Sequence, residues 1–189
     1  MDGNGRWAKK RMLPRIAGHK KGLDSIEVII KSAATYNIST LTLYAFSTEN
    51  WNRPSEEIKG LMGLFSDSIA NETDKLIKNN IKVNILGDIG IFNINLQNKI
   101  KILEKKSLNN TGLNLNIALN YGARSEILMA VNKFYKKLKE RRSVIVEKNI
   151  SDNLYTKKMP DVDLLIRTGG QKRLSNFLLW QVAYSELYF

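Results

Sequence analysis

The sequence of this 189-residue chain predicts a single α/β domain in which a mainly parallel central sheet is flanked by helices. Three observations lead to this prediction. Short apolar runs rich in β-branched residues alternate with longer segments of helical periodicity. No internal repeat, low-complexity linker or Pro/Gly-rich break divides the chain. The length suits one domain that is large enough to bury a core.

The expected strands and helices follow one another along the chain. We expect strands at Thr40–Phe46, Ile81–Leu86, Leu113–Leu119 and Asp163–Arg167. We expect helices at His19–Tyr36, Ser55–Asn79, Ile91–Lys106 and Arg124–Arg142. The second helix has a favourable start, because Ser55 follows Pro54 and precedes two glutamates. Ligands of parallel sheets bind beyond the carboxyl ends of the strands, so a functional site is expected in the segments that follow them.

The helix expected at Ser55–Asn79 carries a wide apolar stripe. Its members are Ile58, Leu61, Met62, Phe65, Ile69, Leu76 and Ile77. Such a stripe is typical of core packing, and it can also form one wall of a hydrophobic tunnel. Both interpretations hold together if the helix faces the sheet across a cavity.

The composition is that of an ordinary folded protein, with 43% hydrophobic and 25% charged residues. There is no cysteine, which excludes disulfides and thiolate metal sites. No apolar run approaches the roughly 20 residues that a membrane-spanning helix needs, and no signal peptide is recognisable. A cytoplasmic protein is the default expectation.

The formal net charge of +12 is open to more than one interpretation. A basic nucleic-acid-binding module would carry base-stacking aromatic side chains on a basic face. Attraction for diphosphates or for a membrane surface is another explanation. Many lysines instead follow helical, solvent-facing patterns, which favours solvated helix faces: Lys99, Lys101, Lys105, Lys106, Lys136, Lys137 and Lys139.

The first segment that points to chemistry is the N-terminal glycine loop, Met1–Ala8. Its two glycines flank Asn4, which lets backbone N–H groups approach a ligand closely. Arg6 adds a planar fork for phosphate, and Asp2 offers a hard oxygen for Mg²⁺. Further basic groups follow at Arg15 and His19, the only histidine. The alternative is a plain turn.

A second polar segment, Ser47–Arg53, follows the first expected strand. Six polar or aromatic residue types crowd into it, and buried polar groups at that density would need many partners. We therefore favour a ligand site. The alternative is a capped loop that leads into the next helix, with Trp51 as a plug of the core.

The third segment, Arg167–Asn176, contains two arginines, a Gly-Gly pair and a serine, which together make a second plausible anion cradle. Beyond it Glu186 stands alone in the apolar run Phe177–Phe189. A buried charge should be paired or bound to a metal, whereas a helix-end carboxylate in solvent would need neither. Two anion cradles with an acidic residue beside each suggest two phosphorylated substrates that share a cation.

These segments resemble the signature blocks of the cis-prenyltransferase family, and they are closest to its bacterial undecaprenyl diphosphate synthases. The blocks occur in family order and span nearly the whole chain. They are Met-Asp-Gly-Asn-Gly-Arg-Trp-Ala at 1–8, Leu-Thr-Leu-Tyr-Ala-Phe-Ser-Thr-Glu-Asn-Trp-Asn-Arg-Pro at 41–54, Leu-Asn-Ile-Ala-Leu-Asn-Tyr-Gly at 115–122, Ile-Arg-Thr-Gly-Gly at 166–170, Ser-Asn-Phe-Leu-Leu-Trp at 175–180 and Glu-Leu-Tyr-Phe at 186–189. The Asp-Asp-x-x-Asp marker of the all-α trans-prenyltransferases is absent from the sequence.

The resemblance implies a role for each matched residue. Asp2 would hold Mg²⁺ against the allylic diphosphate, and Asn50 matches the position proposed to assist proton removal; these two are the expected catalytic residues. Glu186 looks like a second metal ligand that completes the site of a partner subunit. The allylic diphosphate would bind to Gly3, Asn4, Gly5, Arg6, Arg15 and His19, with Trp7 beside it. Ser47, Thr48, Glu49, Trp51 and Arg53 would surround the reacting centre, and Arg167, Arg173, Leu174 and Ser175 would bind isopentenyl diphosphate.

The resemblance also implies an activity. The chain is expected to be a Mg²⁺-dependent transferase that adds isopentenyl diphosphate units in cis to farnesyl diphosphate, and so makes undecaprenyl diphosphate, the precursor of the lipid carrier for cell-wall synthesis. It would act as a cytoplasmic homodimer, peripheral to the inner face of the membrane, with transient membrane-surface association for product release and no nucleic-acid partner. The rival within the family is a non-catalytic partner subunit. Such subunits tend to lose the glycine-loop aspartate and the Asn-Trp motif, which are present here as Asp2, Asn50 and Trp51.

The sequence departs from the family pattern at three points. Family members usually carry a short apolar strand, ending in Ile-Met-Asp, before the glycine loop, and they usually continue beyond Glu-Leu-Tyr-Phe. This sequence begins at Met1 and stops at Phe189. We therefore expect one domain over 1–189 whose sheet lacks a member, in a trimmed or damaged copy of a longer protein. A histidine is common where Lys172 stands, so a proton-handling role at that position is in doubt.

Overall fold

The computed structural model describes residues 2–138 and 144–189. Met1, Lys139 and the end of the helix expected at Arg124–Arg142 lie outside this range. The elements follow in the order α1 (Asn4–Lys9), α2 (Arg15–Thr35), β1 (Thr40–Ser47), η1 (Thr48–Asn52), α3 (Ser55–Lys78), β2 (Lys82–Leu86), η2 (Ile89–Ile91), α4 (Ile94–Ser107), β3 (Asn114–Tyr121), α5 (Ala123–Lys137), α6 (Glu147–Ser151), β4 (Leu164–Ile166) and β5 (Glu186–Tyr188).

The expected α/β fold with a parallel central sheet is confirmed. Three strands lie in the order β1-β3-β2, and both pairs are parallel, with Leu41 and Val83 on either side of Leu115. The fourth expected strand, β4, pairs instead with β5 in a separate parallel sheet. The sequence did not predict β5, because a three-residue strand is too short to show an alternating pattern.

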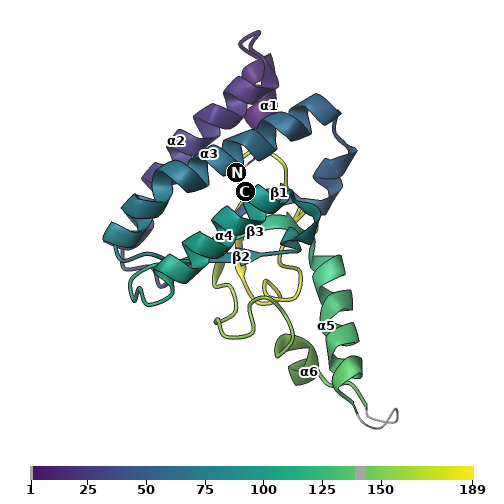
Figure 1. Ribbon diagram of the computed structural model, residues 1–189. Helices are drawn as coiled ribbons and strands as arrows, with labels where there is room; N and C mark the ends of the chain where they lie inside the picture. The colour runs from purple at the N-terminus through teal and green to yellow at the C-terminus, as the bar shows by residue number, and fades with distance from the viewer. Residues whose placement is uncertain (1, 139–143) are drawn as a thin grey trace.

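One face of the central sheet is covered by α2, α3 and α4, which lie side by side in Figure 1. Alternate strand residues point to this face, including Leu41 and Leu43 of β1 and Leu115 of β3. They pack against Ala33 of α2 and Leu103 of α4, both almost fully buried. Each of these helices therefore packs its apolar face against the same side of the sheet.

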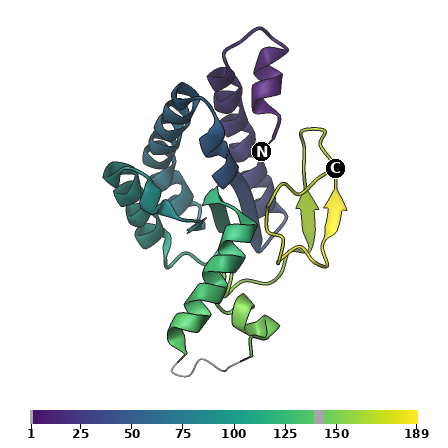
Figure 2. The same ribbon diagram turned by 90° about the vertical axis from the view of Figure 1, so that its right-hand side faces the viewer.

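The opposite face is covered by the chain that runs from α6 to β5. Here Tyr44 of β1 stacks on Phe177 with ring centroids 4.3 Å apart, and Leu178 and Val182 complete a second core. Figure 2 shows β4 and β5 standing beside the central body, while α5 and α6 project away from it. Segments from both ends of the chain thus meet near one edge of the sheet.

Two helices begin at other residues than expected, because the residues that precede them determine where each helix starts. α2 begins at Arg15 rather than His19, because Pro14 has the extended backbone that commonly precedes a helix. α4 begins at Ile94 rather than Ile91, since the Asn93 side chain accepts a hydrogen bond from the Leu96 N–H at 2.9 Å. α3 matches the expected Ser55–Asn79 to within one residue.

The glycine loop is shorter than expected, because Asn4–Lys9 forms the helix α1. This helix packs closely on α2 at Gly18. A Cβ atom at Gly18 would lie 2.0 Å from the carbonyl oxygen of Asn4, a distance that no side chain could occupy. The absence of a side chain at Gly18 therefore sets how near the glycine loop comes to α2. No helix in the described residues has both the length and the apolarity needed to cross a bilayer.

Candidate active site

A cavity of about 1650 Å³ lies between α2, α3 and β1 on one side and the segment around β4 on the other. The structure gathers most of the expected site residues around it, although they come from distant parts of the chain. Those that line it are Asp2, Gly3, Asn4, Gly5, Arg6, Arg15, His19, Ser47, Glu49, Asn50, Arg53, Arg167, Arg173, Leu174 and Ser175.

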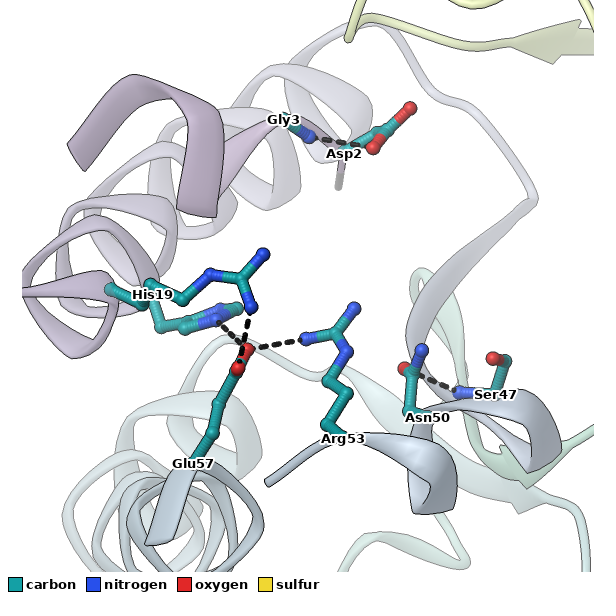
Figure 3. Close-up of polar contacts among 8 residues, drawn as sticks. Asp2, Gly3, His19, Ser47, Asn50, Arg53 and Glu57 are labelled. Carbon is teal, nitrogen blue, oxygen red and sulfur yellow. Dashed lines mark hydrogen bonds and ion pairs between the residues drawn. The ribbon is translucent and has the colours of Figure 1, made fainter. Parts of the chain in front are cut away.

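The first group of basic side chains surrounds Glu57, and we call it the Glu57 cluster (Arg15, His19, Arg53 and Glu57). Arg15 Nη1 donates to Glu57 Oε2 at 2.9 Å, and Arg53 Nη1 donates to Oε1 at 3.0 Å. The ring Nε2 of His19 lies 3.4 Å from the same Oε1. Figure 3 shows Arg53 and His19 reaching the carboxylate from different elements. One carboxylate therefore ties α2 to the start of α3.

The electrostatics of this cluster favour a charged Glu57 and a neutral His19. Burial alone would raise the pKa of Glu57, but the charges of Arg53 and Arg15 and the His19 hydrogen bond hold it below its ordinary value. Burial lowers the pKa of His19, and the nearby Arg53 and Arg15 charges add to this, against the opposing effect of Glu57. A neutral His19 can donate its Nε2 hydrogen to the carboxylate.

The second group joins the two ends of the chain, and we call it the Asp2 cluster (Asp2, Arg167, Arg173 and Ser175). Arg167 Nε donates to Asp2 Oδ2 at 3.0 Å, and its Nη1 donates to Ser175 Oγ at 2.9 Å and to the carbonyl oxygen of Arg173. The Gly3 N–H donates to Asp2 Oδ1 at 2.6 Å. These contacts place the expected isopentenyl diphosphate residues next to the glycine loop.

The approach of the two segments depends on Gly169. A Cβ atom there would lie 2.5 Å from Cγ of Asp2, so any larger residue would push the Arg167–Gly170 turn away from the aspartate. Burial would raise the pKa of Asp2, but the Arg167 and Gly3 hydrogen bonds and the charges of Arg167 and Arg6 hold it below its usual range. Asp2 is therefore ionised at neutral pH.

Asp2 is the residue that best fits a divalent cation. Its side chain is 30% exposed and lines the cavity. Mg²⁺ at phosphate sites takes one or two carboxylates together with substrate oxygens. In the part of the chain that the structure describes, no three His, Cys, Asp or Glu side chains gather into a metal site. A single ionised carboxylate surrounded by basic side chains fits a cation that takes its other ligands from a diphosphate.

Asn50 lies at the end of β1, in the short helix η1. Its carboxamide Oδ1 accepts a hydrogen bond from the Ser47 N–H at 3.1 Å, and its Nδ2 makes no hydrogen bond within the part of the chain that the structure describes. Figure 3 shows this contact close to Arg53 and across from Asp2. In this orientation Asn50 can donate a hydrogen bond to a ligand, but it offers no basic atom.

Four expected site residues do not line the cavity. Trp51 donates its indole N–H to Asn120 Oδ1 at 2.8 Å and packs edge-on against Phe46, as the core-plug alternative expects. Trp7 lies under the guanidinium of Arg11, 4.3 Å from the ring centroid. Thr48 is the first residue of η1. Glu186 is the first residue of β5 and pairs with Leu164 at the start of β4, whereas Arg167 follows the end of β4. The metal prediction for Glu186 stays a prediction.

Two residues that the sequence did not single out belong to the site. From the sequence, Glu57 is only one of the two acids that favour the start of α3, since it stands in the first turn of that helix. Asn176 donates to Glu49 Oε1 at 2.7 Å and accepts from the Arg124 N–H at 2.9 Å, so it joins η1 to α5. The signal for both was their position beside an expected cradle, but most of their partners, such as Arg15 and His19 for Glu57, are distant in sequence.

Much of the remaining wall on the side of α2, α3 and β1 is apolar. From α2 and β1 come aliphatic side chains, and from α3 come Leu61, Leu64 and Phe65. Leu61 and Phe65 belong to the stripe expected on this helix, while Ile69 and Leu76 of the same stripe pack into the core. Part of the stripe therefore lines the cavity while also packing in the core, and part packs in the core alone. The charged mouth and the apolar walls suit a molecule with an anionic head and a hydrocarbon tail.

Sequence comparison identifies relatives over the whole chain. A family model described as "Putative undecaprenyl diphosphate synthase" matches residues 1–189. The ditrans,polycis-undecaprenyl-diphosphate synthase ((2E,6E)-farnesyl-diphosphate specific) of Pasteurella multocida is 51% identical, over 100% of this chain and 80% of its own length. An isoprenyl transferase of Chromobacterium violaceum is also 51% identical, over 100% of this chain and 74% of its own length.

Solved structures give the same picture of the fold. Lavandulyl diphosphate synthase from Lavandula x intermedia, in complex with dimethylallyl diphosphate, is 34% identical with a TM-score of 0.95, over 100% of this chain and 83% of its own. A probable undecaprenyl diphosphate synthase from Campylobacter jejuni is 37% identical with a TM-score of 0.81, over 89% of this chain and 80% of its own.

Proposed function

Since this chain belongs to the undecaprenyl diphosphate synthase family of cis-prenyltransferases, we propose that it extends farnesyl diphosphate by successive cis additions of isopentenyl diphosphate. The product would be undecaprenyl diphosphate, the lipid-carrier precursor for cell-wall synthesis. The observation that carries the proposal is that two basic clusters and Asp2 line one apolar-walled cavity. That cavity offers places for two diphosphates and for one growing hydrocarbon chain.

The allylic substrate would bind with its diphosphate at the Glu57 cluster and the glycine loop. As the allylic carbon–oxygen bond breaks, its electron pair stays on the departing diphosphate, and Arg15, Arg53 and Arg6 stabilise the growing charge. Mg²⁺, held by Asp2 and substrate oxygens, would supply Lewis-acid stabilisation of the same group. His19, whose Nε2 hydrogen is used on Glu57, would help to hold that carboxylate in place without adding charge.

Isopentenyl diphosphate would bind at Arg167, Arg173 and Ser175, which hold its double bond near the allylic carbon. The alkene attacks that carbon, and loss of one proton leaves the new cis double bond. Because a neutral amide is a weak base, we assign Asn50 to orienting a substrate and assign the proton to an oxygen of the released diphosphate. Full turnover with normal substrate binding in the Asn50→Ala variant would remove Asn50 from the reaction.

The growing chain would extend between β1 and the helices α2 and α3. Ala45 is a small side chain of β1 on this wall, beside Phe65 and Leu61. We expect the Ala45→Leu variant to release shorter products than the unaltered chain, because it narrows the space for the tail. Ala34→Leu, on the exposed surface of α2, is the matched control. Unchanged product length in Ala45→Leu would contradict the tunnel assignment.

The decisive assay uses farnesyl diphosphate, labelled isopentenyl diphosphate and Mg²⁺, with and without EDTA, and sizes the lipid products. The proposal expects long-chain products with Mg²⁺ and none with EDTA. Absence of products under both conditions would favour the rival role of a non-catalytic partner subunit. Products that persist in EDTA would contradict the assignment of Mg²⁺ as cofactor.

We also propose a homodimer that works in the cytoplasm at the inner face of the membrane. The exposed position of Glu186, away from Asp2 of its own chain, supports a role in the site of a partner subunit. The exposed tip Lys9–Leu13, with three basic residues and Met12 at 96% exposure, is suited to an anionic lipid surface. Molar mass by light scattering tests the dimer. Co-sedimentation with anionic vesicles tests the tip, and the Met12→Ser variant should bind the vesicles less than the unaltered chain.

A further inference from the structure

We propose that Glu57 is a positioning residue that holds Arg15, His19 and Arg53 in one arrangement for the allylic diphosphate. The inference rests on the proposed function and assigns a role to a residue that the family resemblance left without one. Its basis is the geometry of the Glu57 cluster, in which three side chains that line the cavity share a single carboxylate.

The partners of Glu57 come from separate elements. Arg15 and His19 stand on α2, one turn apart, whereas Arg53 lies between η1 and α3. No hydrogen bond links these three side chains directly to one another in the described residues. Figure 3 shows Glu57 below Arg53 and His19, with its carboxylate directed at both. Without Glu57, no hydrogen bond among the described contacts would fix the Arg53 side chain relative to those of Arg15 and His19.

The free donors of the cluster are left for a ligand. A guanidinium has five N–H donors, and Glu57 uses one nitrogen of Arg15 and one of Arg53. The remaining donors of these two arginines make no hydrogen bond elsewhere in the described residues. The Arg15 side chain also lies against the glycine loop, because a Cβ atom at Gly5 would be 3.1 Å from its Nε. The unused donors therefore lie beside the loop that the allylic diphosphate is expected to contact.

Burial separates Glu57 from ordinary surface ion pairs. Its side chain is 8% exposed, whereas its neighbour Glu56, which pairs with Lys59, is 84% exposed. An exposed pair of that kind contributes little to stability, while a buried carboxylate must be matched by partners. Among the described residues, Glu57 meets this requirement only through Arg15, His19 and Arg53 of the cavity wall. Its environment thus depends on the same side chains that are assigned to the substrate.

The carboxylate has two opposing effects on an incoming diphosphate. Its negative charge reduces the net attraction of the cluster, whereas fixing two flexible arginines removes an ordering cost from binding. With His19 neutral, the cluster keeps a net positive charge from two arginines and one carboxylate. The ordering effect is the larger of the two. Loss of the Glu57 charge should therefore weaken binding of the allylic diphosphate rather than strengthen it.

The test is the Glu57→Gln variant, which keeps the shape and one acceptor oxygen but removes the charge. We expect its KM for farnesyl diphosphate to rise about tenfold, while its KM for isopentenyl diphosphate stays within about twofold. Glu56→Gln is the matched control, since it makes the same change one residue away and should leave both KM values unaltered. Glu57→Asp keeps the charge and should give a smaller rise in the same KM.

Binding of farnesyl thiodiphosphate, an unreactive analogue, gives a readout that is independent of turnover. Calorimetry should show about tenfold weaker binding to Glu57→Gln than to the unaltered chain. A chain that binds the analogue but makes no product would contradict the proposed function and leave this inference standing.

Three results would overturn the inference. An unchanged or lowered KM for farnesyl diphosphate in Glu57→Gln would show that the carboxylate only competes with the substrate. An equal rise of both KM values with a lower melting temperature would show a purely structural role. If Glu57→Gln fails to fold, Glu57→Asp decides, and the inference fails unless that variant raises the farnesyl diphosphate KM alone.

Discussion

The Glu57 cluster and the Asp2 cluster both present arginines to the cavity, but they are built in different ways. In the Glu57 cluster the carboxylate is buried, and its two arginines come from α2 and from the link between η1 and α3. In the Asp2 cluster Arg167 binds its carboxylate across 165 positions of sequence, and that carboxylate remains partly exposed. One cluster has an acid used only as a support, whereas the acid of the other is also the expected metal ligand.

This difference indicates how each cluster should respond to substrate. Arg15 and Arg53 can contact an anion with their free nitrogens while they stay bound to Glu57. Arg167 already uses its Nε on Asp2 and its Nη1 on Ser175, so a cation at Asp2 must share the aspartate with it. We expect the Glu57 cluster to be preformed and the Asp2 cluster to rearrange when metal and substrate bind.

The largest expected effect is at Asp2. Asp2→Asn keeps the size of the side chain but removes the charge that a cation and Arg167 both need, so turnover should fall by about 10²- to 10³-fold. Initial rates with labelled isopentenyl diphosphate over a range of Mg²⁺ concentrations measure this. Asp24→Asn on α2, where the carboxylate is 66% exposed, is the control and should retain full activity. Equal turnover in Asp2→Asn would break the distinction between a supporting and a metal-binding acid.

A smaller effect should separate the two clusters by substrate. Arg53→Lys and Arg167→Lys both keep the charge but lose the planar fork, which we expect to raise a KM by about tenfold. The rise should appear for farnesyl diphosphate in Arg53→Lys and for isopentenyl diphosphate in Arg167→Lys. Steady-state kinetics with each substrate varied in turn give both values. If the two variants affect the same KM, the clusters do not serve different diphosphates.

The smallest effect concerns stability in acid. The folded-state pKa values of Glu57 and Asp2 lie below their ordinary values of 4.5 and 3.8, so in acid the unfolded chain binds more protons than the folded one. The stability that these carboxylates contribute is present above the ordinary values and is lost as the pH falls through the lowered ones. Glu57→Gln should therefore flatten the fall of the unfolding free energy below about pH 4.5. Urea unfolding at several pH values measures this, and a slope unchanged by Glu57→Gln would contradict the predicted ion pairs.

The parts of the fold that the sequence predicted well are those with strong local signals. α3 was placed to within a residue, because Pro54, the acidic first turn and a long apolar stripe lie next to one another. β1, β2 and β3 were found from their apolar runs. The helix α1 and the strand β5 were missed, since both are short and depend on distant contacts, such as the packing of Asn4 on Gly18.

The candidate site was predictable as a set of residue types but not as an arrangement. The glycine loop and the Arg167–Asn176 segment were each recognised, yet nothing local indicates that Arg167 pairs with Asp2. Glu57 resembles any acid in a helix's first turn until its partners at 15 and 19 are placed beside it. The sequence allows Trp51 to be a ligand contact or a core plug, and the Asn120 hydrogen bond and the packing on Phe46 favour the second.

The sheet edge formed by β1 has a consequence for the hydrocarbon chain. In the described residues β1 pairs with β3 alone, so every second residue of Thr40–Ser47 directs its amide and carbonyl groups to the open edge, away from β3, and residues of this strand line the cavity. Hydrocarbon laid along this edge would cut those groups off from water without replacing their hydrogen bonds, which is unfavourable. An extended peptide backbone could satisfy them. The isoprenoid tail should therefore run over the Leu41, Leu43 and Ala45 side chains, on the α2 and α3 side, rather than along the strand's open edge.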